Sequence, residues 1–175
     1  MVRTHRHRRG SSSGFTMIEV MLVVGIIGIV ASMAPKFFIE VTRFVRMNLA
    51  RYEIQRDSKN VMVTINRNMR QAQASSILID QVSGQPYYSR IAFNKFVSDT
   101  SSRSMTFYQE GNSLFAVDNG STRTLCTNLR YIAFSYPRTD DDNVVAVSLT
   151  LEKATYGGES KALQLAVEKI RVMND

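Results

Sequence analysis

Side chains that could carry catalysis are scarce in this 175-residue chain. Its two histidines, His5 and His7, lie among arginines in the first nine residues. No histidine follows them, so the rest of the sequence cannot build a Ser-His-Asp triad, a Cys-His pair or a His-ligated metal site. Phosphate-binding motifs with GxGxxG or Walker spacing are absent as well. We therefore predict that the protein is not an enzyme and has neither catalytic residues nor a bound cofactor.

The remaining groups that could bind a metal are one acidic cluster and one thiol. Asp140, Asp141 and Asp142 supply carboxylate oxygens of the kind that Ca²⁺ prefers, but the spacing of an EF-hand loop is absent. A solvated turn after Pro137 is the favoured interpretation, and calcium binding is the alternative. Cys126 has no second cysteine as a partner, and its apolar surroundings predict a small buried side chain.

The net charge of +7 arises mostly at the N-terminus. Of the 22 basic residues, four lie in the first nine positions. The other 18 are nearly balanced in number by the 15 acidic residues. The four are Arg3, Arg6, Arg8 and Arg9. Because the remaining basic residues are scattered among Asp and Glu, the sequence shows no basic face. We predict no nucleic-acid partner.

A long apolar segment follows this basic leader. Residues 15–35 contain a single charge, Glu19, and as a helix they would be about 30 Å long, the thickness of a bilayer's hydrocarbon core. Basic residues before the segment predict a cytoplasmic N-terminus. An ordinary secretory signal places its cleavage site after the apolar region. Here the candidate site, Gly14-Phe15, comes before it, so cleavage would leave the apolar helix on the mature protein.

The residues at this junction resemble a known signal. Gly14-Phe15-Thr16-Met17-Ile18-Glu19-Val20-Met21-Leu22 is similar to the class III signal of type IV prepilins and type II secretion pseudopilins. The resemblance implies that a membrane aspartyl peptidase cuts after Gly14 and methylates the new amine of Phe15. It also places Glu19 at the position of the glutamate that is the fifth residue of the mature chain in that family.

The position of Glu19 requires a physical explanation, because placing a carboxylate near hydrocarbon costs roughly 2.5–3.5 kcal/mol of free energy. Cleavage after Gly14 would create a cationic partner, the ammonium of Phe15. Glu19 could pair with its own terminus across one helical turn, or with the terminus of a neighbouring subunit and so set the stagger between helices. The resemblance favours the neighbour. The third possibility is that Glu19 simply reaches the lipid headgroups.

Small residues share one face of the apolar helix. Gly25, Gly28 and Ser32 have offsets of zero, three and seven, and small residues let helices approach closely. Glu19 projects roughly on the opposite side. We hypothesise that the small face meets one neighbouring helix, the alternative being that glycine is simply common in membrane helices. Pro35 should kink the helix or mark a short break.

The rest of the chain predicts an α+β fold. Residues 36–74 have apolar residues at helical spacing, namely Val41, Val45, Leu49 and Tyr52, then Met62, Ile65, Met69 and Ala72. From residue 75 to 175 the period becomes two, and turn residues separate eight strand candidates. They are 76–81, 89–96, 104–109, 114–118, 122–125, 129–136, 143–152 and 163–172. Hairpin turns are expected at 109–113, 118–120 and 155–160. We predict an antiparallel sheet head packed on residues 36–74, after the leader 1–14 and the membrane helix 15–35.

A second resemblance concerns the head and suggests the kind of subunit. The order of INRNMRQAQ (65–73), SMTFYQEGNSLF (104–115), TLCTNLRYIAFSYP (124–137) and VVAVSLTLE (144–152) is similar to J-type minor pseudopilins and W-type minor pilins. This implies a minor pilin-like subunit near a filament tip, in a type II secretion pseudopilus or a type IV pilus. A minor pilin of a DNA-uptake or motility pilus, or a signal-anchored extracytoplasmic binding domain, is the alternative.

The expected partners and location follow from the same resemblance. The partners are other pilin-like subunits, the prepilin peptidase and N-methyltransferase, and an inner-membrane assembly platform. The chain is expected to cross the bacterial inner membrane once, with its head in the periplasm, and then to enter an extracytoplasmic filament.

Overall fold

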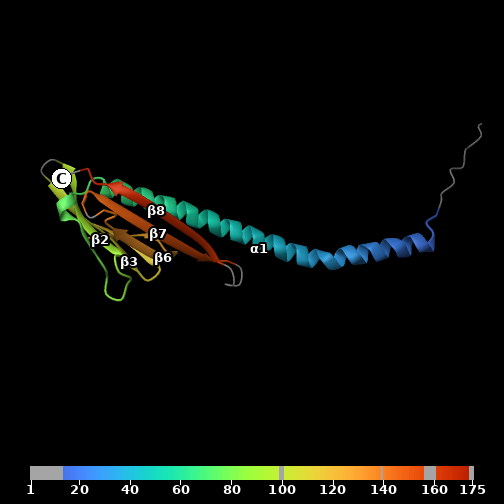
Figure 1. Cartoon of the computed structure of the whole chain (residues 1–175). Helices are drawn as coiled ribbons and strands as arrows, with labels where there is room; N and C mark the ends of the chain where they lie inside the picture. Colours follow the sequence, from blue (N-terminus) through green and yellow to red (C-terminus); the bar gives the residue numbers. More distant parts are fainter. Residues whose placement is uncertain (1–13, 99–100, 139, 156–160, 174–175) are drawn as a thin grey trace, which may run out of the picture. The chain divides into compact units, whose positions relative to one another are not determined.

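One long helix precedes all the strands of the chain. The computed structural model describes residues 14–98, 101–138, 140–155 and 161–173. Helix α1 (Met17–Met69) is followed by a short 3-10 helix, η1 (Ala74–Ser76), and eight strands. The chain divides into two units, one ending at Thr42 and the other beginning at Arg43, and α1 contributes to both (Figure 1).

The first unit consists of the apolar start of α1. Its large hydrophobic side chains are exposed all around the helix, from Phe15 through Val41. By length and composition α1 is able to cross a membrane, since its N-terminal part is a long apolar stretch and none of that stretch is buried. Pro35 lies inside the helix, so the short non-helical break that was one expectation for this proline is not observed.

In the first helical turns of the second unit, α1 buries a different face from the one that the sequence predicted. Val45, Leu49 and Tyr52 remain exposed, although their spacing predicted burial. Ala50 and Ile54 are buried instead. At 100° per residue these two sets lie on opposite faces of the helix, and both are apolar enough to be the inner face. Further along α1 the predicted residues Met62, Ile65, Met69 and the following Ala72 are buried as expected.

Helix α1 ends at Met69, earlier than the predicted end near residue 74. The reason lies in the backbone hydrogen bonds of the next residues. Gln73 donates its N–H to the Asn94 carbonyl at 2.8 Å, and Phe96 donates to the Gln71 carbonyl at 3.1 Å. The chain after Met69 therefore pairs with a strand rather than continuing its own helical turn.

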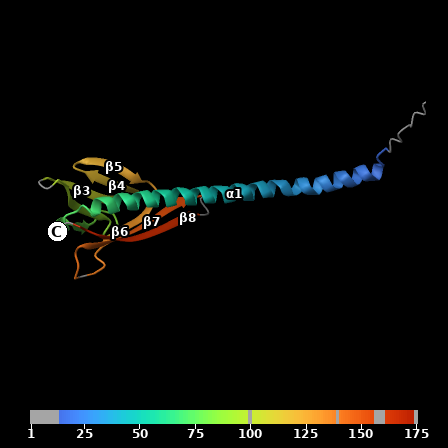
Figure 2. The same ribbon diagram turned by 90° about the horizontal axis from the view of Figure 1, so that it is seen from above.

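All eight predicted strands are present, in two antiparallel sheets rather than one. The five-stranded sheet has the order β1-β2-β3-β4-β5, and the three-stranded sheet has the order β6-β7-β8. Their bounds are β1 Leu78–Asp80, β2 Arg90–Ser98, β3 Ser101–Glu110, β4 Ser113–Asp118, β5 Ser121–Cys126, β6 Leu129–Ser135, β7 Val144–Ala154 and β8 Lys161–Arg171. In Figure 2, β3–β5 lie on one side of the later half of α1 and β6–β8 on the other.

Tight hairpins join neighbouring strands, as the turn residues predicted. Gly111, with a φ of 58°, turns β3 into β4. Asn119 and Gly120, with φ values of 50° and 87°, join β4 to β5, and an Asn-Gly pair with two positive φ angles is typical of a type I′ turn. β7 pairs with β8 as expected, and residues 156–160 of the predicted turn lie outside the described residues.

The core of the second unit joins the helix to both sheets. Ile65 and Met69 from α1, Phe107 from β3 and Phe134 from β6 are fully buried in one cluster. A buried side chain also links the two sheets. Gln109 of β3 accepts the backbone N–H of Ile132 at 3.2 Å and donates to the Gly111 carbonyl at 3.0 Å. Satisfying a buried amide in this way fixes how β3 and β6 meet.

This packing predicts unequal costs for two truncations on α1. Ile65→Ala should lower the free energy of unfolding by about 2–5 kcal/mol, because it removes a fully buried side chain and leaves a cavity. Val63→Ala, two positions away and 58% exposed, is the matched control and should change it by less than about 0.5 kcal/mol. Urea denaturation of the full chain in detergent measures both. Equal effects of the two substitutions on the free energy of unfolding would contradict the assignment of Ile65 to the buried face of α1.

Candidate functional site

The helix start holds a side-chain arrangement that the sequence reasoning did not identify. The Thr16 N–H donates to Glu19 Oε2 at 2.9 Å, and the Thr16 hydroxyl donates to the same oxygen at 3.0 Å. In return, the Glu19 N–H donates to Thr16 Oγ1 at 3.4 Å. Since α1 begins at Met17, Thr16 is the N-cap and Glu19 is the third helical residue, which makes a capping box. The Thr-x-x-Glu spacing is the sequence signal that predicts it.

This cap sets the helix boundary next to the predicted cleavage bond. Gly14, Phe15 and Thr16 are not helical, and the Phe15 side chain is 87% exposed. A peptide bond outside helical hydrogen bonding is accessible to a protease, because the backbone need not unwind before it enters an active site. The Gly14–Phe15 bond is therefore presented in exposed chain directly ahead of the capped helix.

The helix cap uses only one of the two oxygens of the Glu19 carboxylate. Both Thr16 bonds go to Oε2, and within the described residues Oε1 has no hydrogen-bond partner. A carboxylate accepts several hydrogen bonds, so one oxygen can cap the helix while the other meets a cation. Capping and charge pairing are thus compatible roles for one side chain.

Gly25, Gly28 and Ser32 lie on an open face of α1. A Cβ added at either glycine would meet nothing within 4 Å. The Ser32 hydroxyl donates to the Ile29 carbonyl at 2.7 Å, so its polar group is satisfied within the helix. The face carries no unsatisfied group that would hinder close packing of a second helix.

The acidic residues 140–142 do not converge on one point. Asp140 pairs with Arg138 at 2.9 Å, and Asp141 accepts the backbone N–H of Asn143 at 3.1 Å. Asp142 is exposed. Among the residues that the structure describes, no group of three or more His, Cys, Asp or Glu side chains is arranged to hold a metal ion.

Cys126 is confirmed as a small buried side chain, with 6% of its surface exposed. Burial raises the pKa of its thiol to about 11. Because the thiolate is the reactive form, this cysteine is a packing residue rather than a nucleophile at neutral pH.

Comparison with known families bears on the N-terminus. Residues 9–35 match the family model described as the prokaryotic N-terminal methylation motif. The chain carries a prepilin-type signal. This confirms the predicted resemblance to type IV pilin-like proteins, and the long helix followed by antiparallel sheets has the α+β pilin-like arrangement. A search of curated proteins found no match, and neither did a search of solved structures.

The signal gives the apolar part of α1 a role in this pilin-like chain. The matched residues include the start of this membrane-capable helix, which anchors the protein in a membrane. The exposed apolar side chains of this helix need lipid or other helices around them, because no part of the apolar stretch is buried within the chain itself.

The open glycine face generates one prediction. Gly28→Leu should leave the membrane-anchored chain folded, because the added side chain has free space, but should reduce its association with other pilin-like helices severalfold. Crosslinking of helices in the native membrane measures this association. Ile27→Leu, which adds no bulk on the glycine face, is the matched control. Unchanged association of the Gly28 variant would show that this face is not a packing surface.

Proposed function

We propose that the protein is a minor pilin-like subunit of a type II secretion pseudopilus or a type IV pilus, with a structural and assembly role near the filament tip. The observation that carries this proposal is the methylation motif at residues 9–35, which includes the start of an apolar helix whose side chains are exposed all around. A prepilin peptidase cuts between Gly14 and Phe15 and methylates Phe15, and the head domain stays outside the cytoplasm.

The exposed helix supports a filament rather than a permanent anchor alone. A helix that is apolar on every face is stable in a membrane and equally in a bundle of similar helices. The subunit is first stored in the inner membrane, where lipid covers α1. An assembly platform then transfers it to the filament, where neighbouring subunits replace lipid without exposing α1 to water.

The capping box supports a specific role for Glu19 in this transfer. Oε2 holds the helix cap through Thr16, and Oε1 remains available for a cation. After cleavage the nearest new cation is an N-terminal ammonium. Pairing with the terminus of a neighbouring subunit sets the axial stagger between helices, and the neutralised pair is cheaper to keep in an apolar bundle than a lone carboxylate.

The first test is the N-terminus of the protein isolated from the cell that makes it. Intact mass spectrometry should find a chain that begins with N-methylated Phe15. Gly14→Val should retain the residues before Phe15. Since a Cβ added at Gly14 meets no atom within 4 Å, we expect the defect to be one of cleavage and not of folding. Finding the leader intact on the wild-type chain would instead indicate a signal-anchored binding domain.

Two substitutions at Glu19 separate its charge from its capping. Glu19→Gln keeps a side-chain oxygen that can accept the Thr16 hydrogen bonds but removes the charge, whereas Glu19→Leu removes both. If the charge pair directs assembly, both variants should enter filaments at least about tenfold less than the wild type. If Glu19→Gln assembles normally and Glu19→Leu does not, Glu19 acts only as a cap. Immunoblots of sheared filaments measure incorporation, with the membrane-bound pool as reference.

The two kinds of filament are distinguished by phenotype. Deletion of the gene should abolish release of secreted proteins if the subunit belongs to a secretion pseudopilus. Loss of twitching motility or of DNA uptake, with secretion unchanged, would assign it to a pilus.

A further inference from the structure

Strand β8 is an open edge of the three-stranded sheet. It pairs with β7 over all eleven of its residues, Lys161–Arg171, and follows β7 at the end of the strand order. Within the described residues no other strand pairs with it. An edge strand has unpaired backbone groups that can accept another strand, so proteins usually protect such edges.

The register shows which β8 residues direct their backbone groups to this edge. Val172 donates its N–H to the Asn143 carbonyl at 2.8 Å, and Arg171 lies opposite Val144. Because hydrogen-bonded and non-hydrogen-bonded pairs alternate in an antiparallel ladder, Arg171 belongs to a non-hydrogen-bonded pair. Every second residue before it does too. Their N–H and C=O groups therefore point away from β7, and these residues are Lys169, Val167, Leu165, Leu163 and Lys161.

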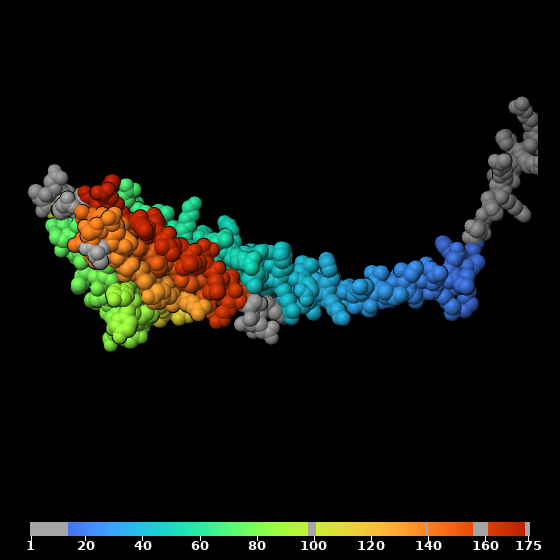
Figure 3. Space-filling view, viewed as in Figure 1, coloured from blue at the N-terminus to red at the C-terminus, as the bar shows by residue number. Residues whose placement is uncertain are grey.

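The same residues carry the outward side chains of β8. Leu163, Leu165 and Val167 are 57%, 65% and 60% exposed, and Lys169 and Arg171 are exposed beyond them. In Figure 3 the red surface of β8 is open to the viewer beside α1. An edge protected against pairing would carry charges along its length. This edge instead has three aliphatic residues in its middle, with Lys161 before them and two cations after them.

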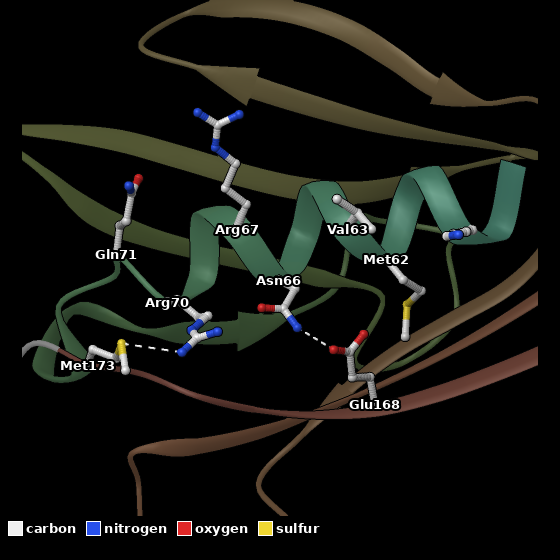
Figure 4. Close-up of a pocket in the computed structure, with 9 residues that line it drawn as sticks. Met62, Val63, Asn66, Arg67, Arg70, Gln71, Glu168 and Met173 are labelled. Carbon is white, nitrogen blue, oxygen red and sulfur yellow. Dashed lines mark hydrogen bonds between the residues drawn. The ribbon is translucent and has the colours of Figure 1, made fainter.

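A groove of about 560 Å³ runs between α1 and this edge. Figure 4 shows Met62 and Asn66 of α1 facing Glu168 of β8, with the Asn66 amide bonded to the Glu168 carboxylate. Lys59 and Arg70 also line the groove, and among the described residues neither has an ion pair with a carboxylate. The groove is therefore apolar at Met62 and lined by more cations than carboxylates, since its one carboxylate, Glu168, is bonded to Asn66.

We propose that an extended segment of another filament subunit adds to the free edge of β8 as a further strand and covers this groove. Aliphatic side chains of the segment pack on Leu163, Leu165 and Val167. Carboxylates of the segment lie near Lys169 and Arg171 on the outer face and near Arg70 on the groove side. Main-chain hydrogen bonds hold the segment, and alternate side chains select it. This inference rests on the proposed function in one respect only, namely that the partner is another filament subunit.

The positive charges on β8 disfavour a second copy of the same strand as its partner. An antiparallel pair centred on Leu165 would align the aliphatic residues, but it would also place Lys161 of each copy opposite Lys169 of the other. Like charges directly opposite each other destabilise a pair of strands. The segment that fits must carry carboxylates.

Nucleic acid and lipid fit the edge less well than a peptide. Sites for single-stranded nucleic acid use aromatic side chains to stack bases, and no aromatic residue lines the groove. Neither ligand offers the alternating N–H and C=O groups that complete an edge strand. A peptide backbone does, which is why a protein segment is the occupant.

Photocrosslinking tests this contact in the full chain, expressed in its own cell with its usual partners. A benzoyl-phenylalanine at Leu165 should crosslink to another pilin-like subunit, in a segment that alternates aliphatic and acidic residues. The control is the same probe at Thr122 on β5, an exposed polar position on the edge of the other sheet, which should give at least about fivefold less adduct. Adducts that contain two copies of this chain, or only lipid or nucleic acid, would overturn the proposal.

Charge reversal tests the selectivity. Lys169→Glu should lower the Leu165 adduct about threefold or more, and a compensating acidic-to-lysine change in the crosslinked segment should restore it. Arg123→Glu on β5 makes the same charge change away from the groove and should leave the adduct unchanged. Circular dichroism of both variants confirms folding. An adduct insensitive to Lys169→Glu would rule out the acidic segment.

The two proposals fail separately. If Glu19→Leu blocks filament entry while the Leu165 adduct persists in the membrane pool, the β8 contact stands without the filament. If filaments form normally and Leu165 gives no adduct above Thr122, the β8 contact is wrong and the filament role is untouched.

Discussion

The apolar beginning of α1 is the constraint on which the rest of the protein depends. None of the membrane-capable window is buried within the chain, and its side chains are aliphatic on every face. In water such a helix would have no means of covering this surface, so the protein must remain with lipid or with other helices at every stage. The prepilin-type signal at residues 9–35, which includes the start of the helix, matches this requirement.

A single carboxylate connects the start of this helix to its surroundings. Glu19 completes a capping box with Thr16, which satisfies backbone donors that would otherwise be unpaired at the helix end. Because the cap uses one oxygen, the other is open to a cation. The proposed pair with a neighbour's terminus adds an interaction to the cap and does not replace it. One carboxylate can therefore serve both the cap and the proposed charge pair.

The head domain combines a well-packed interior with a sheet edge whose middle is aliphatic and exposed. Both sheets are simple meanders of neighbouring strands, and the buried Gln109 and the helix core hold them together. Among the described residues β8 is different, because its free edge presents aliphatic side chains together with backbone groups that no other strand pairs. A soluble monomer gains nothing from such an edge, whereas a subunit that works in an assembly has a partner to complete it.

The sequence by itself determined the features that depend on local patterns. Residue type and spacing were sufficient for the signal at Gly14-Phe15, the apolar helix, the eight strands and the Asn119-Gly120 turn, because each depends on side chains close together in the chain. The tertiary structure decided which face of α1 is inside, since Val45 and Leu49 are as apolar as Ile54 and only the sheets distinguish the two faces. It also decided the division into two sheets, the end of α1 at Met69 and the open edge of β8. These depend on backbone pairing between distant residues, such as Gln73 with Asn94, and no spacing along the chain encodes which distant partner a strand or helix end will meet.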